Sequence, residues 1–178
     1  MAKVVKMAQL DLATISVEAP VLVDTKSRSA SVAMPMLQTA ELTYTLSGDG
    51  GSVEVLCDNE QSEKIHEIDD VLIATIADSS EDWFGRKINI DQVERMFRPT
   101  LQGNRNPRQV LNASKLKFFD NQMKPCDTFP PAGSAMFIMR LDDIHFEEKV
   151  CEARWSLVQA KEAIEVAASP ANDPMFVS

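Results

Sequence analysis

Apolar and polar residues alternate along much of the first third of the chain, which predicts strands. In residues 41–46 every second position is apolar, and the glycine-rich turn 48–51 follows. The alternation resumes at Val53 and Val55, so this segment is predicted to be a β-hairpin. Two earlier runs are also predicted strands: residues 10–23, which are rich in β-branched residues, and residues 29–35, which are short and moderately apolar. The inward positions expected in the first run are Leu10, Leu12, Ile15 and Val17.

The hydrophobic period then changes to that of a helix. In residues 59–77 isoleucine and leucine recur at spacings of three and four, and charged residues occupy the other face. Asp58 or Asn59 is the expected N-cap, and the pair Ser79-Ser80 is expected to end the helix. A second short helix is predicted over residues 91–97, and residues 102–108 have the composition of a loop.

The last third of the chain returns to strands, which we place at residues 110–119, 133–146 and 152–160. Strands, a helical insertion at about 59–98 and further strands, with no alternation of strand and helix, indicate a mainly β fold with inserted helices. A small antiparallel barrel or sandwich fits this order. We expect one domain over residues 1–165 and a flexible tail at 166–178, where alanine, serine and proline dominate.

The cysteine content and the N-terminal residues indicate the cellular compartment. The three cysteines, Cys57, Cys126 and Cys151, are an odd number with wide spacing, which favours reduced thiols over disulfides or a zinc site. The first twelve residues contain charges and no continuous apolar core, so we expect no secretory signal and no membrane association. These features predict an intracellular protein.

The charge is unevenly distributed along the chain. Residues 86–124 contain nine lysines and arginines and only three acidic residues, a net charge of +6. Because the whole 178-residue chain has a net charge of −9, the remainder carries −15. A basic middle in an acidic protein is the asymmetry expected for an anionic partner held at one site. Such a sequence window need not fold into one surface patch.

Catalytic motifs are missing from the sequence. There are two histidines, no phosphate-binding glycine loop and no nucleophile elbow, so we expect no enzyme and no cofactor. On a strand, Asp143, His145 and Glu147 would share a face and could hold a divalent metal. A solvated strand face is the interpretation that the sequence favours, and we therefore predict no metal site.

Two groups of motifs resemble a known family. Residues 82–88 read Asp-Trp-Phe-Gly-Arg-Lys-Ile, and residues 154–160 read Arg-Trp-Ser-Leu-Val-Gln-Ala, after a strand that contains Met136, Leu141 and Phe146. In their order and separation, over about residues 60–162, these motifs resemble single-stranded DNA-binding proteins of large nucleo-cytoplasmic DNA viruses. That family is regarded as related to the single-stranded DNA-binding proteins of short-tailed phages.

The resemblance implies an OB-type antiparallel Greek-key barrel, a basic groove for the strand, and self-association. It also implies a C-terminal tail with an acidic and aromatic tip that contacts replication proteins. Asp173 and Phe176 are the residues that match this tip. The match is incomplete, because this tail has one acid instead of a run and two residues after the phenylalanine.

Together these features predict a protein that binds single-stranded DNA without sequence preference during replication or recombination, at a viral replication site in the host cytoplasm or nucleus. Cations follow the phosphates of a single strand and aromatic rings stack on its bases. On an alternating strand Lys115, Lys117 and Phe119 would share one face, which makes Phe119 the best stacking candidate. The other predicted contacts are Arg86, Lys87, Arg98, Arg105 and Arg108.

Two alternatives remain open at this point. Trp83, Phe84 and Trp155 are more typical of core residues than of a stacking platform. The whole protein is also compatible with a structural or assembly component of a virion that uses the same barrel as a protein–protein module, since an acidic chain suits protein partners.

Overall fold

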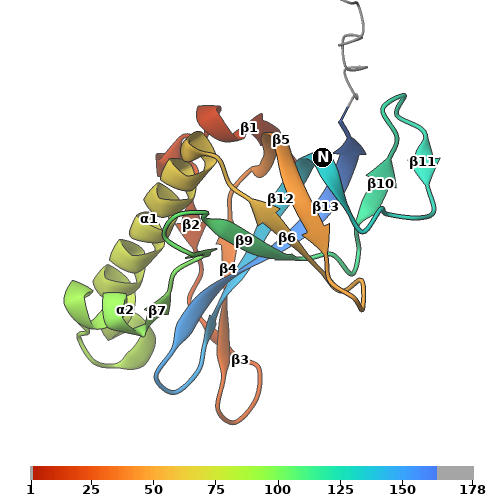
Figure 1. Ribbon diagram of the computed structural model, residues 1–178. Coiled ribbons are helices and arrows are strands. Elements are labelled where there is room, and N and C mark those ends of the chain that lie inside the picture. Colours follow the sequence, from red (N-terminus) through yellow and green to blue (C-terminus); the bar gives the residue numbers. More distant parts are fainter. Residues whose placement is uncertain (1, 164–178) are drawn as a thin grey trace, which may run out of the picture.

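The computed structural model describes residues 2–163. The predicted tail, with Asp173 and Phe176, lies outside the described residues. The described chain has two α-helices, two short 3-10 helices (Met7–Gln9 and Leu12–Thr14) and thirteen strands, and Figure 1 shows them in sequence colours.

Five strands close into a barrel. They are β5 (Met36–Leu46), β6 (Ser52–Leu56), β9 (Arg108–Asn112), β12 (Ala132–Phe146) and β13 (Cys151–Glu162). Antiparallel pairing joins β5 to β6, β6 to β9, β5 to β12 and β12 to β13, and a parallel contact between β9 and β13 closes the ring. A three-stranded meander closed in this way by two further strands is the OB-type Greek-key barrel. The predicted fold class is therefore confirmed.

Shorter strands extend the barrel at its edges. Figure 1 shows β10 and β11 as a hairpin at one end of the molecule, while β3 and β4 form a hairpin that projects from another side. The shorter strands are β1 (Val4–Lys6), β2 (Ser16–Val17), β3 (Val21–Leu22), β4 (Arg28–Ala33), β7 (Phe97–Arg98), β8 (Leu101–Gln102), β10 (Lys117–Phe119) and β11 (Pro125–Cys126).

The predicted hairpin at residues 41–55 is confirmed as the β5–β6 pair. Leu42 and Tyr44 point into the barrel, as the alternation requires. In the turn, the Asp49 carboxylate accepts hydrogen bonds from the Gly51 N–H at 2.9 Å and the Ser47 hydroxyl at 2.6 Å. Gly50 has a φ of 71°, a conformation that glycine adopts without strain.

The long helix α1 (Asn59–Phe84) begins at the predicted N-cap. The Asp58 carboxylate accepts a hydrogen bond from the Gln61 N–H at 2.8 Å. The predicted end at Ser79-Ser80 is wrong, because the buried Ser80 hydroxyl donates to the Ala77 carbonyl at 2.8 Å within the helix. It also accepts from the Ile88 N–H at 2.8 Å, which fixes the chain beyond the helix. The helix ends at Gly85, where φ is 69°.

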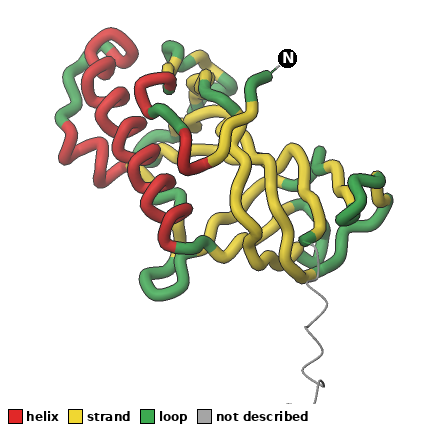
Figure 2. The backbone as a smooth tube through the Cα atoms, turned by 90° about the horizontal axis from the view of Figure 1, so that it is seen from above, coloured by secondary structure: helices red, strands yellow, loops and turns green. Residues whose placement is uncertain are grey.

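The second helix, α2 (Ile90–Met96), confirms the prediction to within one residue. The Asn89 side chain accepts from the Gln92 N–H and the Gln92 side chain accepts from the Asn89 N–H, which is a capping box. Both helices lie between β6 and β9 in sequence, and Figure 2 shows them together on one side of the strands. Within residues 2–163, no helix is both long and apolar enough to span a membrane.

Two predicted strands are wrong. Residues 10–23 contain a 3-10 turn (Leu12–Thr14) and only the short strands β2 and β3, because the Asp11 carboxylate accepts from the Ala13 N–H at 3.0 Å and turns the chain. Of the four predicted inward residues only Leu10 is fully buried. Residues 110–119 divide into β9 and β10, because the Asn112 side chain accepts from the Ser114 N–H at 2.9 Å and starts a turn.

Candidate nucleic-acid interface

Strands β6 and β9 present one face to the barrel interior and the other to solvent. Val53, Val55 and Leu111 are fully buried inside, whereas Arg108, Val110 and Asn112 are exposed on the outer face of β9. In OB-folds the face of the second and third strands, with the loops between strands 1 and 2 and between strands 4 and 5, binds oligonucleotides and oligosaccharides. Here these elements are β6, β9, the β5–β6 turn and the β12–β13 turn.

A groove of about 560 Å³ borders this face. We call it the β9 groove, and it lies between β7, β8 and β9 on one side and β12 and β13 on the other. Most of its side chains are polar, including Arg98, Gln102, Asn112, Asp142, Glu152 and Arg154. The groove can therefore donate and accept hydrogen bonds along its length.

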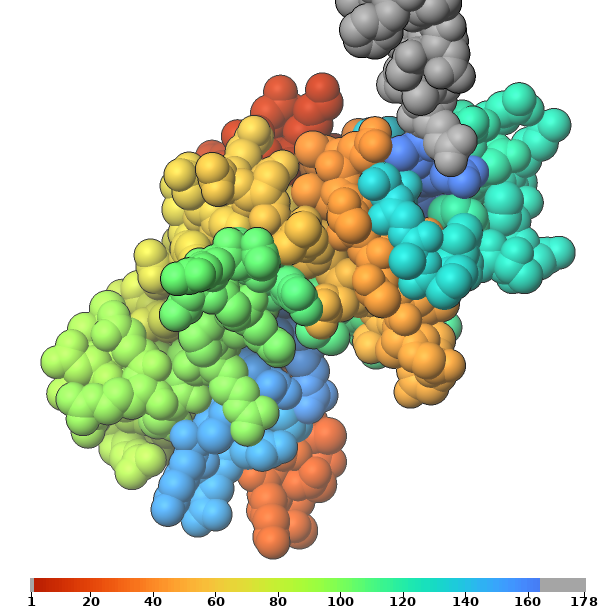
Figure 3. Space-filling view, viewed as in Figure 1, coloured from red at the N-terminus to blue at the C-terminus, as the bar shows by residue number. Residues whose placement is uncertain are grey.

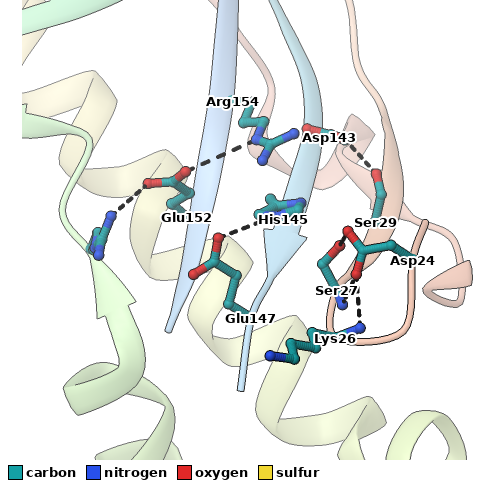
Figure 4. Close-up of polar contacts among 10 residues, drawn as sticks. Asp24, Lys26, Ser27, Ser29, Asp143, His145, Glu147, Glu152 and Arg154 are labelled. Carbon is teal, nitrogen blue, oxygen red and sulfur yellow. Dashed lines mark hydrogen bonds and ion pairs between the residues drawn. The ribbon is translucent and has the colours of Figure 1, made fainter. Parts of the chain in front are cut away.

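Carboxylates offset the positive charge at this face, and the lining of the β9 groove holds two arginines, Arg98 and Arg154, against Asp142, Asp143 and Glu152. The Arg108 guanidinium lies 2.9 Å from the Glu54 carboxylate across the β6–β9 pair. Glu152 lies between two arginines, 3.4 Å from Arg98 and 3.9 Å from Arg154, and Figure 4 shows its contact with Arg154. All these side chains are more than a third exposed, and such surface pairs contribute only about 0–1 kcal/mol. Each arginine can therefore exchange its carboxylate for a phosphate at little cost.

The basic stretch runs along one edge of β13. In the strand pairing, Arg98 of β7 lies opposite Glu152, Asn112 of β9 opposite Ser156, and Lys117 of β10 opposite Gln159. At about 3.3 Å per residue, the row from Arg98 to Lys117 spans about 23 Å. Figure 3 shows the green segment that ends at β9 and the teal β10–β11 segment on the same face, with the orange β5–β6 hairpin between them. Arg98 and Lys117 thus mark the two ends of a row along β13, with Arg108 beside it on β9, instead of a compact patch.

The predicted face of Lys115, Lys117 and Phe119 is correct only in part. Lys117 and Phe119 lie on the outer face of β10, while Phe118 is buried with its ring 4.8 Å from that of Phe129. Lys115 belongs to the turn before β10 and is outside this alternation. Phe119 is half-buried in an apolar hollow of about 240 Å³, beside Met123, Met136 and Ile138. It therefore has an exposed edge next to a lysine.

The remaining predicted cations lie apart. Arg105 is exposed in the β8–β9 loop. Arg86 and Lys87 follow the end of α1, where the Lys87 ammonium donates to the Ala77 carbonyl at 3.1 Å. Arg86 lines a different pocket from the β9 groove. The structure therefore brings Arg98 and Arg108 to one face, extends the row to Lys117, and leaves Arg86 and Lys87 elsewhere.

The aromatic residues of the two motifs serve mainly in packing. Trp155 is buried on β13, and the Phe84 ring packs edge-on against Phe146 with 5.4 Å between centroids. Trp83 is half-buried and packs against Phe84 at 6.2 Å. The core interpretation is therefore the better one for these three residues.

His145 does not lie on the solvated strand face that the sequence predicted. It is buried, at 7% exposure, and β4 and β13 pair with the two edges of this part of β12. Its Nε2 lies 3.5 Å from the Glu147 carboxylate, and the neighbouring Asp143 accepts a hydrogen bond from the Ser29 hydroxyl (Figure 4). Among the described residues, no group of three or more His, Cys, Asp and Glu side chains is placed to hold a metal ion.

Of the residues that line the β9 groove, only Arg98 was predicted as a contact from the sequence, and the polar residues that were missed include Gln102, Asn112 and Arg154. Asn112 could have been found, because it follows Arg108 and Val110 at every second position of β9. Arg154 lies in the Arg-Trp motif, but its position in the groove depends on the pairing of β12 with β13. No pattern in the sequence gives that pairing.

Comparison with protein-family models gives no match, and comparison with curated protein sequences gives none. Among solved structures, the fold is similar to that of the single-stranded DNA-binding protein from bacteriophage Enc34, with a TM-score of 0.44, 6% identity, and coverage of 83% of this chain and 89% of that chain. A structure of the single-stranded DNA-binding protein from bacteriophage Enc34 in complex with ssDNA gives a TM-score of 0.40, 9% identity, and coverage of 83% and 92%. The barrel assignment itself rests on the strand pairings of this chain, and membership of the viral family suggested by the sequence motifs stays a prediction.

Proposed function

We propose that this protein binds single-stranded DNA without sequence preference, along the outer face of β9 and the β13 edge, and protects it during replication or recombination. The observation that carries the proposal is the row of cations beside the OB-type barrel, from Arg98 through Arg108 to Lys117. Arg108 lies on β9, one of the two strands whose outer face OB-folds use for oligonucleotides, and Arg98 and Lys117 lie on the neighbouring strands β7 and β10.

The chemistry of the row suits a flexible anionic strand. Arginine and lysine side chains follow phosphates, and their exposed positions let them adapt to the backbone. Gln102 and Asn112 add hydrogen-bond donors and acceptors within the β9 groove. Phe119, which is half-buried next to Lys117, is the candidate for stacking against one base, and stacking of this kind tolerates every base.

The first test is fluorescence anisotropy of a labelled oligo-dT of about 16 nucleotides, titrated with protein across a salt series. Binding that weakens steeply as salt rises, and that Arg108→Glu or Lys117→Glu reduces, would support the proposal. Arg95→Glu is the matched control, because Arg95 is an exposed cation of α2 that lines neither the groove nor the row. Absence of binding at low salt would contradict the proposal.

A second candidate is a structural or assembly protein. It is favoured by Val21, Leu22 and Val23, which are 67%, 69% and 61% exposed on the β3–β4 hairpin. Consecutive exposed apolar residues are typical of protein–protein contacts. A chain that binds no oligonucleotide but self-associates, and whose self-association Leu22→Ser abolishes, would favour this candidate.

A further inference from the structure

A second pocket, separate from the β9 groove, lies among the end of α1, α2 and the β3–β4 and β12–β13 hairpins. We call it the helix-end pocket, and its volume is about 320 Å³. Its apolar surface comes from four elements and includes Phe84, Ile88, Val93, Phe146 and Cys151. Because burial raises the pKa of the Cys151 thiol to about 12, this thiol stays protonated and adds to the apolar surface.

Three cations surround this apolar surface. Lys26, Arg28 and Arg86 come from separate parts of the chain, and none of the three forms a salt bridge with another residue in the range 2–163. The Arg28 guanidinium lies 5.9 Å from the centre of the Phe84 ring and donates a long hydrogen bond, at 3.4 Å, to the Trp83 carbonyl. Its other N–H groups remain available for a ligand.

The charge around the pocket is positive. Glu147 and Glu148 also line it, which leaves an excess of one positive charge over the five ionised side chains. The Glu147 carboxylate lies 3.5 Å from the Nε2 of His145. An anionic group is therefore favoured near Arg28 and Arg86, while the apolar surface favours a flat, weakly polar ring.

From this arrangement we propose that the helix-end pocket binds one nucleotide, with its base against Phe84 and Ile88 and its phosphate between Arg28 and Arg86. The pocket has the size of a small-molecule site, an apolar lining and a few convergent charges, as such sites require. The choice of a nucleotide over another amphipathic anion rests on the proposed function. It also gives Arg86, which lies outside the β9 groove, a role in binding.

The position of the pocket restricts which nucleotide can enter. Cys151 lines the pocket, whereas the next four residues of β13, from Glu152 to Trp155, line the β9 groove, and the two sites share no lining residue. A strand that follows the groove must turn around the β12–β13 hairpin to reach the pocket. The nucleotide in the pocket is therefore a free mononucleotide or the terminal unit of a bound strand.

The test is an NMR titration of the protein with labelled methionine methyl groups, using thymidine 5′-monophosphate as the ligand. Met96 lines the helix-end pocket, whereas Met123 and Met136 line the hollow beside Phe119 and report on the other site. We expect the Met96 signal to shift and saturate while the other two stay in place. We expect Arg86→Gln to weaken this binding at least about fivefold, since it removes a charged donor, and Arg95→Gln to leave it unchanged.

Several outcomes would overturn the proposal. They are an unmoved Met96 signal up to about 10 mM nucleotide, equal shifts at Met123 and Met136, or the same saturating shift with inorganic phosphate alone. In a fourth outcome, oligo-dT binds in a way that depends on Arg108, but the mononucleotide does not bind. This result would rule out nucleotide binding in the pocket and leave the proposed function intact. Mononucleotide binding at Met96 without any oligo-dT binding would support the pocket and contradict the proposed function.

Discussion

Glu54 and Glu152 control how much positive charge the outer face of β9 presents, because each holds an arginine of the row. Glu54 forms its ion pair with Arg108 at 2.9 Å, and both side chains are about half exposed. A phosphate must displace this carboxylate before it can bind the guanidinium. We expect Glu54→Gln to tighten oligo-dT binding about two- to fivefold, since the pair itself is weak and a like charge near the phosphates is removed.

The matched control for this prediction is Glu41→Gln. Glu41 is exposed on β5 and forms no salt bridge among the described side chains, so the variant changes the net charge by the same amount. If both variants tighten binding equally in the anisotropy titration, the effect comes from net charge. The prediction that Glu54 acts locally, through its ion pair with Arg108, would then be wrong.

Asp69 is a buried carboxylate whose titration should be visible in stability. Its two oxygens accept hydrogen bonds from the Thr100 N–H at 2.9 Å and the Thr100 hydroxyl at 2.6 Å. Burial raises the pKa of Asp69 above its ordinary value of 3.8, although these hydrogen bonds act in the opposite direction. The folded protein therefore holds this proton to a higher pH than the unfolded chain does.

The contribution of Asp69 to the free energy of unfolding depends on pH. The contribution of Asp69 to stability is complete below about pH 3.8 and is lost as the pH rises through the raised folded pKa. We expect the free energy of unfolding of the wild type, minus that of Asp69→Asn, to fall between about pH 4 and about pH 7 in urea titrations. A difference that is constant or rises with pH would contradict this prediction.

At the residue scale, sequence reasoning succeeded where chemistry is local. Asp58 was predicted as a helix cap and caps α1, because its carboxylate reaches an N–H three residues away. His145 was predicted on a solvated face and is buried, and one of the two strands beside it, β4, is distant in sequence. The pairing of Arg98 with Glu152 was likewise out of reach, since the two residues are 54 positions apart.

At the element scale, Gly85 fixes the end of α1 and the start of the segment that carries Arg86. Its φ is 69°, and a Cβ added there would have no atom within 4 Å, so only backbone strain opposes a larger residue. We expect Gly85→Ala to lower the free energy of unfolding by about 1 kcal/mol, measured by urea unfolding. Gly48→Ala is the control, because Gly48 has equal space and needs no positive φ, and its effect should be within about 0.5 kcal/mol.

The elements that sequence patterns predicted correctly have strong local signals. The β5–β6 hairpin combines alternation with a glycine turn, and α2 has a capping box. The predicted strand at residues 110–119 failed because its apolar pattern continues through a turn set by the Asn112 side chain. Alternation reports which residues face inward, but it does not detect a side-chain hydrogen bond that bends the chain.

At the scale of the whole molecule, a protein with a negative net charge is proposed to bind single-stranded DNA, which is itself negatively charged. The chain has a net charge of −9, and three cations of the basic stretch, Arg98, Arg108 and Lys117, lie on β7, β9 and β10, which all pair with β13. Barrel closure produces this row, because β13 pairs in parallel with three segments that are separate in sequence. The asymmetry of charge was therefore predictable from the sequence, whereas its direction across the surface depended on the fold.

The row gives a quantitative prediction for salt dependence. If the three cations of the row and Arg154 of the groove contact phosphates, the logarithm of the oligo-dT binding constant should fall with the logarithm of salt concentration with a slope of about −3. Lys117→Gln should reduce the magnitude of this slope by about 0.7, since one phosphate contact is lost, whereas Arg95→Gln on α2 should not change it. The slopes come from anisotropy titrations at several salt concentrations. A slope close to zero, or equal changes in the two variants, would contradict this prediction. Repulsion by the acidic rest of the protein would then outweigh the cations along β13, and the row would have no role in binding.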